Sequence, residues 1–84
     1  MASKNTMLCN YHAAIDCADA LLEDYIDEHG ENGAQRIADD KDLASYRRLC
    51  AKRLQKANQT NSLADYKAAE EMAAMFHYWV LEHY

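Results

Sequence analysis

The fold of this chain is decided by residues 8–29, LCNYHAAIDCADALLEDYIDEH. Seven mostly apolar side chains recur there at alternating steps of three and four: Leu8, Tyr11, Ile15, Ala18, Leu22, Tyr25 and His29. This spacing places them along one face of an α-helix. With a cap at Asn5 or Thr6 and a glycine at position 30 to end it, the pattern predicts a helix over about residues 6–29.

Two later segments repeat the helical pattern. The first covers about residues 40–57, with Asp39 or Asp40 as its cap, and the second covers about residues 62–83, where Ser62 and Asp65 resemble a capping box. The apolar positions of the last segment cover more than one stripe: Leu63, Tyr66, Ala69, Met72, Ala73, Met75, Phe76, Trp79, Val80 and Tyr84. A helix with so wide an apolar surface needs two neighbours.

Residues 30–40 are expected to form a turn-rich connection. Asn32-Gly33 is a turn signal, and a short helical turn near residues 34–38 would bring Ile37 to the core. The chain has no proline and only two glycines in 84 residues, which favours helices over strands. We therefore predict an all-α fold: one domain over residues 1–84, built as a small antiparallel bundle of three long helices.

Charge is sorted by segment along the chain. Residues 1–40 carry a net charge of −7, residues 41–60 carry +5, and residues 61–84 carry −3, which gives −5 for the whole. Sorting of this kind affects how a surface attracts partners more than how it folds.

The acids of the first helix form the main candidate site. Successive turns opposite the apolar stripe carry Asp16, Asp19, Glu23, Asp24, Asp27 and Glu28, with Tyr25 as a candidate anchor. Like charges four residues apart destabilise a helix, and acids near its C-terminus oppose its dipole. One interpretation is a docking surface for a basic partner; the other is a solvated face neutralised by bases of the second helix.

The second helix carries the opposite charge. Its bases form a ridge that could contact nucleic acid: Arg47, Arg48, Lys52, Arg53 and Lys56. Pairing with the acidic helix is the competing interpretation. The sequence has no helix-turn-helix, RNP or zinc-finger pattern, and its net negative charge opposes nucleic-acid binding.

The aromatic end of the chain could hold a second copy. Phe76 and Val80 point away from Tyr78 and Leu81 on a helix, so one side can be buried while the other stays open. The residues that we expect at such a contact are Tyr78, Trp79, Leu81 and Tyr84, and they make a homodimer a possible arrangement.

No pattern in the sequence indicates catalysis or a cofactor. Cys9, His12 and Asp16 share one helix face, but three ligands on one helix cannot complete a structural zinc site, so no metal is expected. The three serines lie outside any nucleophile motif. An odd number of cysteines favours the reducing cytoplasm, and no apolar run approaches the roughly 18 residues of a membrane span.

These observations favour a non-enzymatic protein-binding module, an inhibitor or adaptor that docks its acidic helix on a basic partner surface. In size and composition alone the chain resembles the accessory and inhibitor proteins of phages and mobile elements. The alternative function is a nucleic-acid-binding regulator that uses the basic second helix on a dimeric scaffold.

Overall fold

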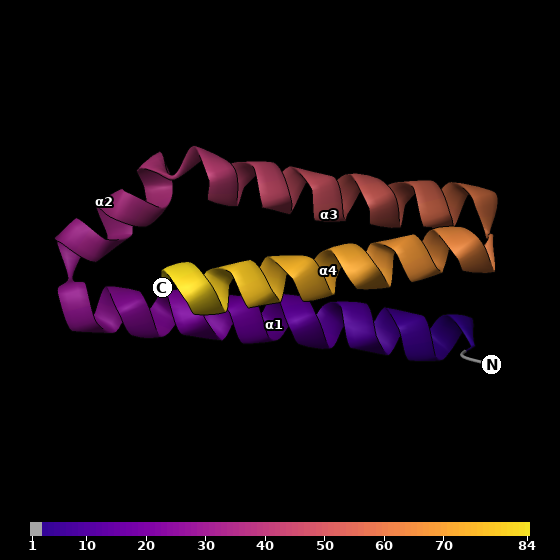
Figure 1. The fold of residues 1–84 in the computed structure, drawn as a ribbon, viewed down its shortest axis with the longest axis horizontal. Coiled ribbons are helices and arrows are strands. Elements are labelled where there is room, and N and C mark those ends of the chain that lie inside the picture. The colour runs from indigo at the N-terminus through magenta and orange to yellow at the C-terminus, as the bar shows by residue number, and fades with distance from the viewer. Residues whose placement is uncertain (1–2) are drawn as a thin grey trace.

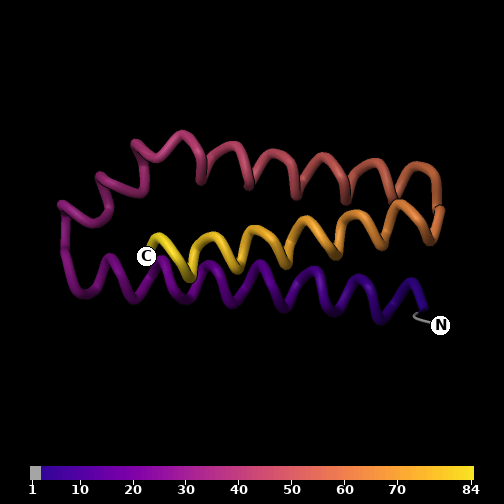
Figure 2. Tube along the Cα trace, viewed as in Figure 1, coloured from indigo at the N-terminus to yellow at the C-terminus, as the bar shows by residue number. Residues whose placement is uncertain are grey.

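The computed structural model describes residues 3–84, which form four α-helices and no β-strand (Figure 1). Helix α1 spans Lys4–His29, α2 spans Glu31–Asp39, α3 spans Lys41–Thr60 and α4 spans Leu63–His83. The long helices α1, α3 and α4 lie along one another, and α2 crosses obliquely from the end of α1 to the start of α3 (Figure 2). The all-α bundle is confirmed, but the count of three helices is wrong.

The fourth helix lies where the sequence predicted a turn-rich connection with only a short helical turn near residues 34–38. Gly30 adopts φ +62°, a backbone conformation that glycine tolerates and other residues rarely adopt. Its N–H donates to the carbonyl of Ile26 at 2.7 Å, and its own carbonyl accepts from the N–H of Ala34 at 3.1 Å. One residue therefore ends α1 and begins α2 without a connecting loop.

Gly33 is not part of a turn but a buried residue inside α2. A Cβ atom at this position would lie 2.8 Å from the Cβ of His29 and 3.2 Å from the carbonyl oxygen of Tyr25. The missing side chain is what lets α2 cross so close to α1. The Asn32-Gly33 pair was misinterpreted because a glycine for a turn and a glycine for close packing look alike in sequence.

The helix ends differ from the predicted ones by a few residues. Ser3, rather than Asn5 or Thr6, caps α1, because its Oγ accepts from the N–H of Thr6 at 3.2 Å. Asp40 is confirmed as the cap of α3, while the capping box at the start of α4 is wrong, since Ser62 makes no side-chain cap hydrogen bond.

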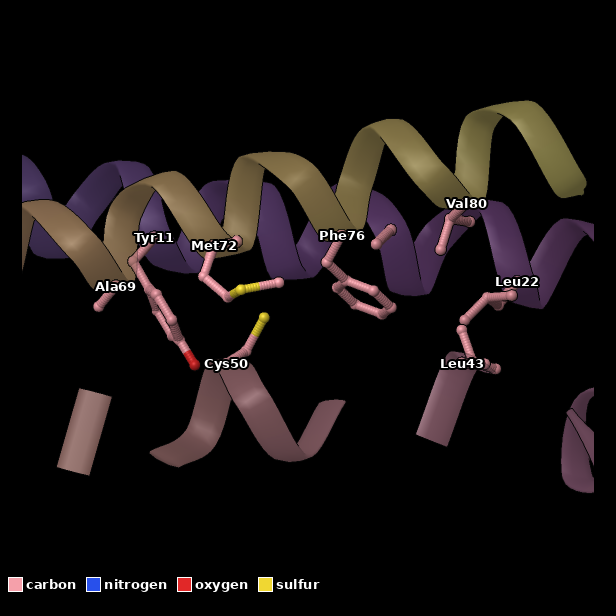
Figure 3. Packing of buried hydrophobic residues seen from close by; sticks show 10 residues of the cluster. Tyr11, Leu22, Leu43, Cys50, Ala69, Met72, Phe76 and Val80 are labelled. Atoms are coloured by element: carbon pink, nitrogen blue, oxygen red, sulfur yellow. The ribbon is translucent and has the colours of Figure 1, made fainter. Parts of the chain in front are cut away.

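Helix α4 lies between the other long helices and packs on both α1 and α3. This confirms the two neighbours expected from its wide apolar surface. Its buried residues are Tyr66, Ala69, Met72, Ala73, Phe76 and Val80. In Figure 3, Tyr11 of α1 and Met72 of α4 converge on Cys50 of α3. Complete burial of a side chain such as Phe76 contributes about 1.5–3 kcal/mol to folding.

Some apolar positions of the predicted helices are exposed. Leu49 is 43% exposed, Leu63 47% and Met75 56%, whereas Ile37 packs against the core as expected. The opposed directions of Phe76 and Tyr78 are confirmed, since Phe76 is fully buried and Tyr78 is exposed. Among residues 3–84, no helix combines the length and the apolar character needed to cross a bilayer.

Candidate functional site

The acidic face of α1 comprises Asp16, Asp19, Glu23, Asp24, Asp27 and Glu28. It lies opposite the side that buries Tyr11, Ala18 and Leu22, because helical periodicity separates the two sets. Five of the six acids are exposed, and Asp19 is half-buried. The structure therefore brings the predicted acids together on one solvent-facing surface.

Only a small part of this charge is neutralised within the molecule. Asp19 accepts a hydrogen bond from Arg47 of α3, with 2.7 Å between Oδ1 and Nη2. Glu28 lies 3.8 Å from the Nε2 of the adjacent His29. The other four acids make no ion pair with a base anywhere in residues 3–84. Pairing with the basic helix was the competing interpretation, and here it accounts for one acid of six.

Tyr25, the candidate anchor, lies half-buried at the α2 end of α1. Its hydroxyl accepts a hydrogen bond from Arg36 Nη1 at 2.7 Å, and this bond raises the pKa of Arg36. The guanidinium lies 4.6 Å above the ring of Tyr84 and donates to the carbonyl of His83 at 3.1 Å. Tyr25 thus contacts the Arg36 guanidinium, which links α2 to the end of α4. The sequence did not indicate this role for Arg36.

The hydroxyl of Tyr84 donates to Asp40 Oδ2 at 2.6 Å, which joins the end of α4 to the start of α3. Burial opposes the charge of Asp40, but hydrogen bonds from Tyr84 and from the N–H groups of Leu43 and Asp42 outweigh it, so its pKa is lowered. Burial and the bond to Asp40 raise the pKa of Tyr84 to about 12. Tyr84, expected at a self-association contact, is half-buried and engaged within its own chain.

The bases of α3 lie on three different sides of the helix. Arg47 faces α1 and also lies 5.4 Å above the ring of Phe76. Arg48 and Lys52 surround the exposed Leu49 on the solvent side. The two remaining bases of the predicted ridge are Arg53, which borders α4, and Lys56, which lies 3.9 Å from Asp65.

An apolar groove runs between α3 and α4 on the surface. We call it the α3–α4 groove, and its apolar lining is Tyr46, Leu49, Met75, Tyr78 and Trp79. The rings of Tyr46 and Trp79 lie 5.3 Å apart, and an open pocket of about 380 Å³ adjoins them. Trp79 and Tyr78 were expected at a self-association contact, whereas Leu49 and Met75 were not among the residues predicted there.

The groups that could support other chemistry are dispersed. Cys9, His12 and Asp16 are each exposed on α1, and in the described part of the chain no three His, Cys, Asp or Glu side chains converge. Burial raises the pKa of the Cys50 thiol to about 11, which keeps it protonated near neutral pH. The thiols of Cys9 and Cys17 are free and exposed.

Comparison with known proteins adds no relative to this description. No protein-family model, no curated protein and no solved structure matches the chain. The functional argument therefore depends on the surfaces described above.

Proposed function

We propose that this chain is a non-enzymatic protein-binding module, an inhibitor or adaptor, that docks the acidic face of α1 on a basic surface of a partner protein. Acids on successive turns of α1 recur about every 6 Å, so they present a row of negative charge similar in kind to a nucleic-acid backbone. Basic surfaces that bind nucleic acid are accordingly included among its targets. The proposal extends to a cytoplasmic location, which the three free cysteines support.

The observation that carries the proposal is the set of exposed acids without a cationic partner. Asp16, Glu23, Asp24 and Asp27 have no cationic partner in residues 3–84. Asp27 also repels Glu23 four residues before it and Asp24 three residues before it, and each such pair costs a few tenths of a kcal/mol. The acids in the last turns of α1 also oppose the helix dipole. Because the described residues recover almost none of this cost, a partner that supplies cations explains why the acids are there.

The decisive experiment is a double charge reversal, Glu23→Lys with Asp27→Lys. A control variant, Glu31→Lys with Asp39→Lys, makes the same change in net charge on α2, outside the acidic face. Each immobilised protein is used to capture partners from an extract of the source cells, at low and at high salt, and the captured proteins are identified by mass spectrometry.

We expect the wild type and the α2 control to capture the same partner at low salt, with binding weakened at high salt. The α1 variant should lose that partner, yet its helicity by circular dichroism and its melting temperature should equal or exceed those of the wild type. Capture that survives the α1 reversal would exclude the acidic face as the docking surface.

The second candidate function, nucleic-acid binding by α3, has one specific observation in its favour. Lys52 and Arg53 form no ion pair with a carboxylate in residues 3–84, so their charges remain available for phosphates. Against it, Arg47 is held by Asp19. A mobility shift with duplex DNA and with single-stranded RNA at low salt tests this function, and the affinity should fall steeply as salt rises.

A further inference from the structure

Three of the five large apolar side chains that are exposed in residues 3–84 line the α3–α4 groove. Leu49 is 43% exposed, Met75 56% and Tyr78 64%, and Leu81, three residues after Tyr78 on α4, is 53% exposed. These large side chains lie on adjacent helices rather than singly, and contiguous apolar patches of this kind mark interaction sites. Aromatic residues and methionine are also the types enriched where proteins meet.

The charges along the groove are separated lengthwise. Asp42 stands at the start of α3 and Glu82 near the end of α4, and both helix ends lie beside α2 (Figure 1). Eleven residues farther along α3, about 16 Å, lies Arg53, flanked by Lys52 and by Lys56. The groove thus has an acidic end beside α2 and a basic end toward the turn that joins α3 to α4.

These end charges are not neutralised along the groove. Asp42, Glu82, Lys52 and Arg53 make no ion pair within residues 3–84. Glu71 borders the same depression as Arg53, and Lys56 lies 3.9 Å from Asp65, so three bases at this end of the groove stand against two acids. The groove therefore presents an apolar centre between two ends of opposite charge.

We propose that the α3–α4 groove is the interface of a homodimer, and that its two-fold axis crosses the groove near Leu49 and Met75. An axis in this direction reverses the second copy end to end, so the acidic end of each groove meets the basic end of the other. An axis parallel to the groove would instead bring acid against acid and base against base. A groove with acids at one end and bases at the other is complementary to a second copy only when that copy runs in the opposite direction.

The molecule is large enough for such an interface. Its Cα extents are 42 × 20 × 16 Å, so a broad face offers about 800 Å², which is the area that each partner of a standard interface buries. The proposal depends on the groove and not on the acidic face of α1, which lies on another helix. The Glu23→Lys and Asp27→Lys reversals should therefore leave the dimer intact.

Sedimentation velocity over about 1 µM to about 1 mM tests whether the dimer forms, since a dimer with a dissociation constant below about 1 mM is populated in this range. Leu49→Glu and Met75→Glu place a charge at the proposed centre and should each raise the dissociation constant at least about a hundredfold. Leu63→Glu is the matched control, because Leu63 is 47% exposed but lies at the far end of α4. A wild type that remains monomeric, or a dimer that tolerates both central variants, would overturn the proposal.

Charge reversals test the direction of the axis. Arg53→Glu and Glu82→Arg should each weaken the dimer at least about tenfold, because each brings like charges together at both ends of the interface. The double variant should restore it, and since the two positions lie at opposite ends of the groove, that rescue can only occur between copies.

The parallel axis predicts a different result. In that arrangement Glu82→Arg would meet Asp42 of the second copy and tighten the dimer. Tighter association by Glu82→Arg, or a double variant as weak as the single ones, would therefore overturn the reversed orientation.

Discussion

The close crossing of α1 and α2 at Gly33 can be tested by adding a single methyl group. Gly33→Ala introduces a Cβ that would lie 2.8 Å from the Cβ of His29 and 3.2 Å from the carbonyl oxygen of Tyr25. Both of these atoms are fixed by the backbone of α1, so they cannot move aside as the end of a flexible side chain could. The two helices must separate to accommodate the substitution.

Two effects of opposite sign set the expected change in stability. Alanine is favoured over glycine inside a helix by about 1 kcal/mol. Inserting a methyl group into a packed contact costs about 1–3 kcal/mol, and the rigid neighbours put this site in the upper part of that range. The net expectation is a loss of about 1–2 kcal/mol, which corresponds to a fall in melting temperature of about 4–16 °C for a domain of this size.

Thermal and urea unfolding followed by circular dichroism measure this change. Gln35, an exposed residue of the same helix, supplies the control, because the difference between Gln35→Gly and Gln35→Ala reports helix propensity alone. His29→Gly removes the nearest atom, so the penalty at position 33 should shrink in the His29→Gly background. A Gly33→Ala protein as stable as the wild type, or more stable, would refute the close crossing.

Three further predictions concern the core, the thiols and the end of α4. Phe76→Ala should cost about 3–5 kcal/mol in urea unfolding, because the ring is completely buried. Iodoacetamide should label the exposed Cys9 and Cys17 in the native protein and Cys50 only after unfolding, as mass spectrometry would show. The pKa of Tyr84 is raised from 10.0 to about 12, so its contribution to stability is complete below pH 10 and lost as pH rises toward 12. Between pH 10 and pH 12 the Tyr84→Phe variant should therefore lose less stability than the wild type, as measured by urea midpoints. An equal loss in the two proteins would contradict a stabilising role for the Tyr84 hydroxyl.

Much of the fold could be predicted because the spacing of apolar residues identifies the buried side of each long helix. The alternating steps of Tyr11, Ala18 and Leu22 define the buried side of α1, and the wide apolar surface of α4 predicted its two neighbours. Asp40 could be recognised as a cap because the residue types that cap helices are few.

Helix α2 was predicted only as a short helical turn because its signals conflict. Gly30 is both the end of one helix and the start of the next, and Gly33 looks like a turn residue although it serves a close contact. Whether a glycine forms a turn or a close helix contact depends here on where α1 lies, and the local sequence does not give that position. The exposure of Leu49 could not be predicted for a related reason, since periodicity gives the face of a helix but not the width of the surface that neighbours cover.

The candidate sites were predictable to different degrees. The acids of α1 share a face because of their spacing alone, so their common exposure followed directly from the sequence. That Arg47 would reach Asp19 while Lys52 and Arg53 would stay apart from α1 depends on how α3 is rotated about its axis. The lengthwise separation of Asp42 from Arg53 along a groove required both helices to be placed.

The position of α4 also constrains the order in which the molecule can fold during synthesis. Helices α1 and α3 pack mainly on α4, so until α4 is synthesised they lack the partner that buries their apolar stripes. At that stage of synthesis, helices α1 to α3 should fluctuate and stay open to proteases and chaperones until α4 emerges. Translation of α4 is then the event that commits the chain to its native structure.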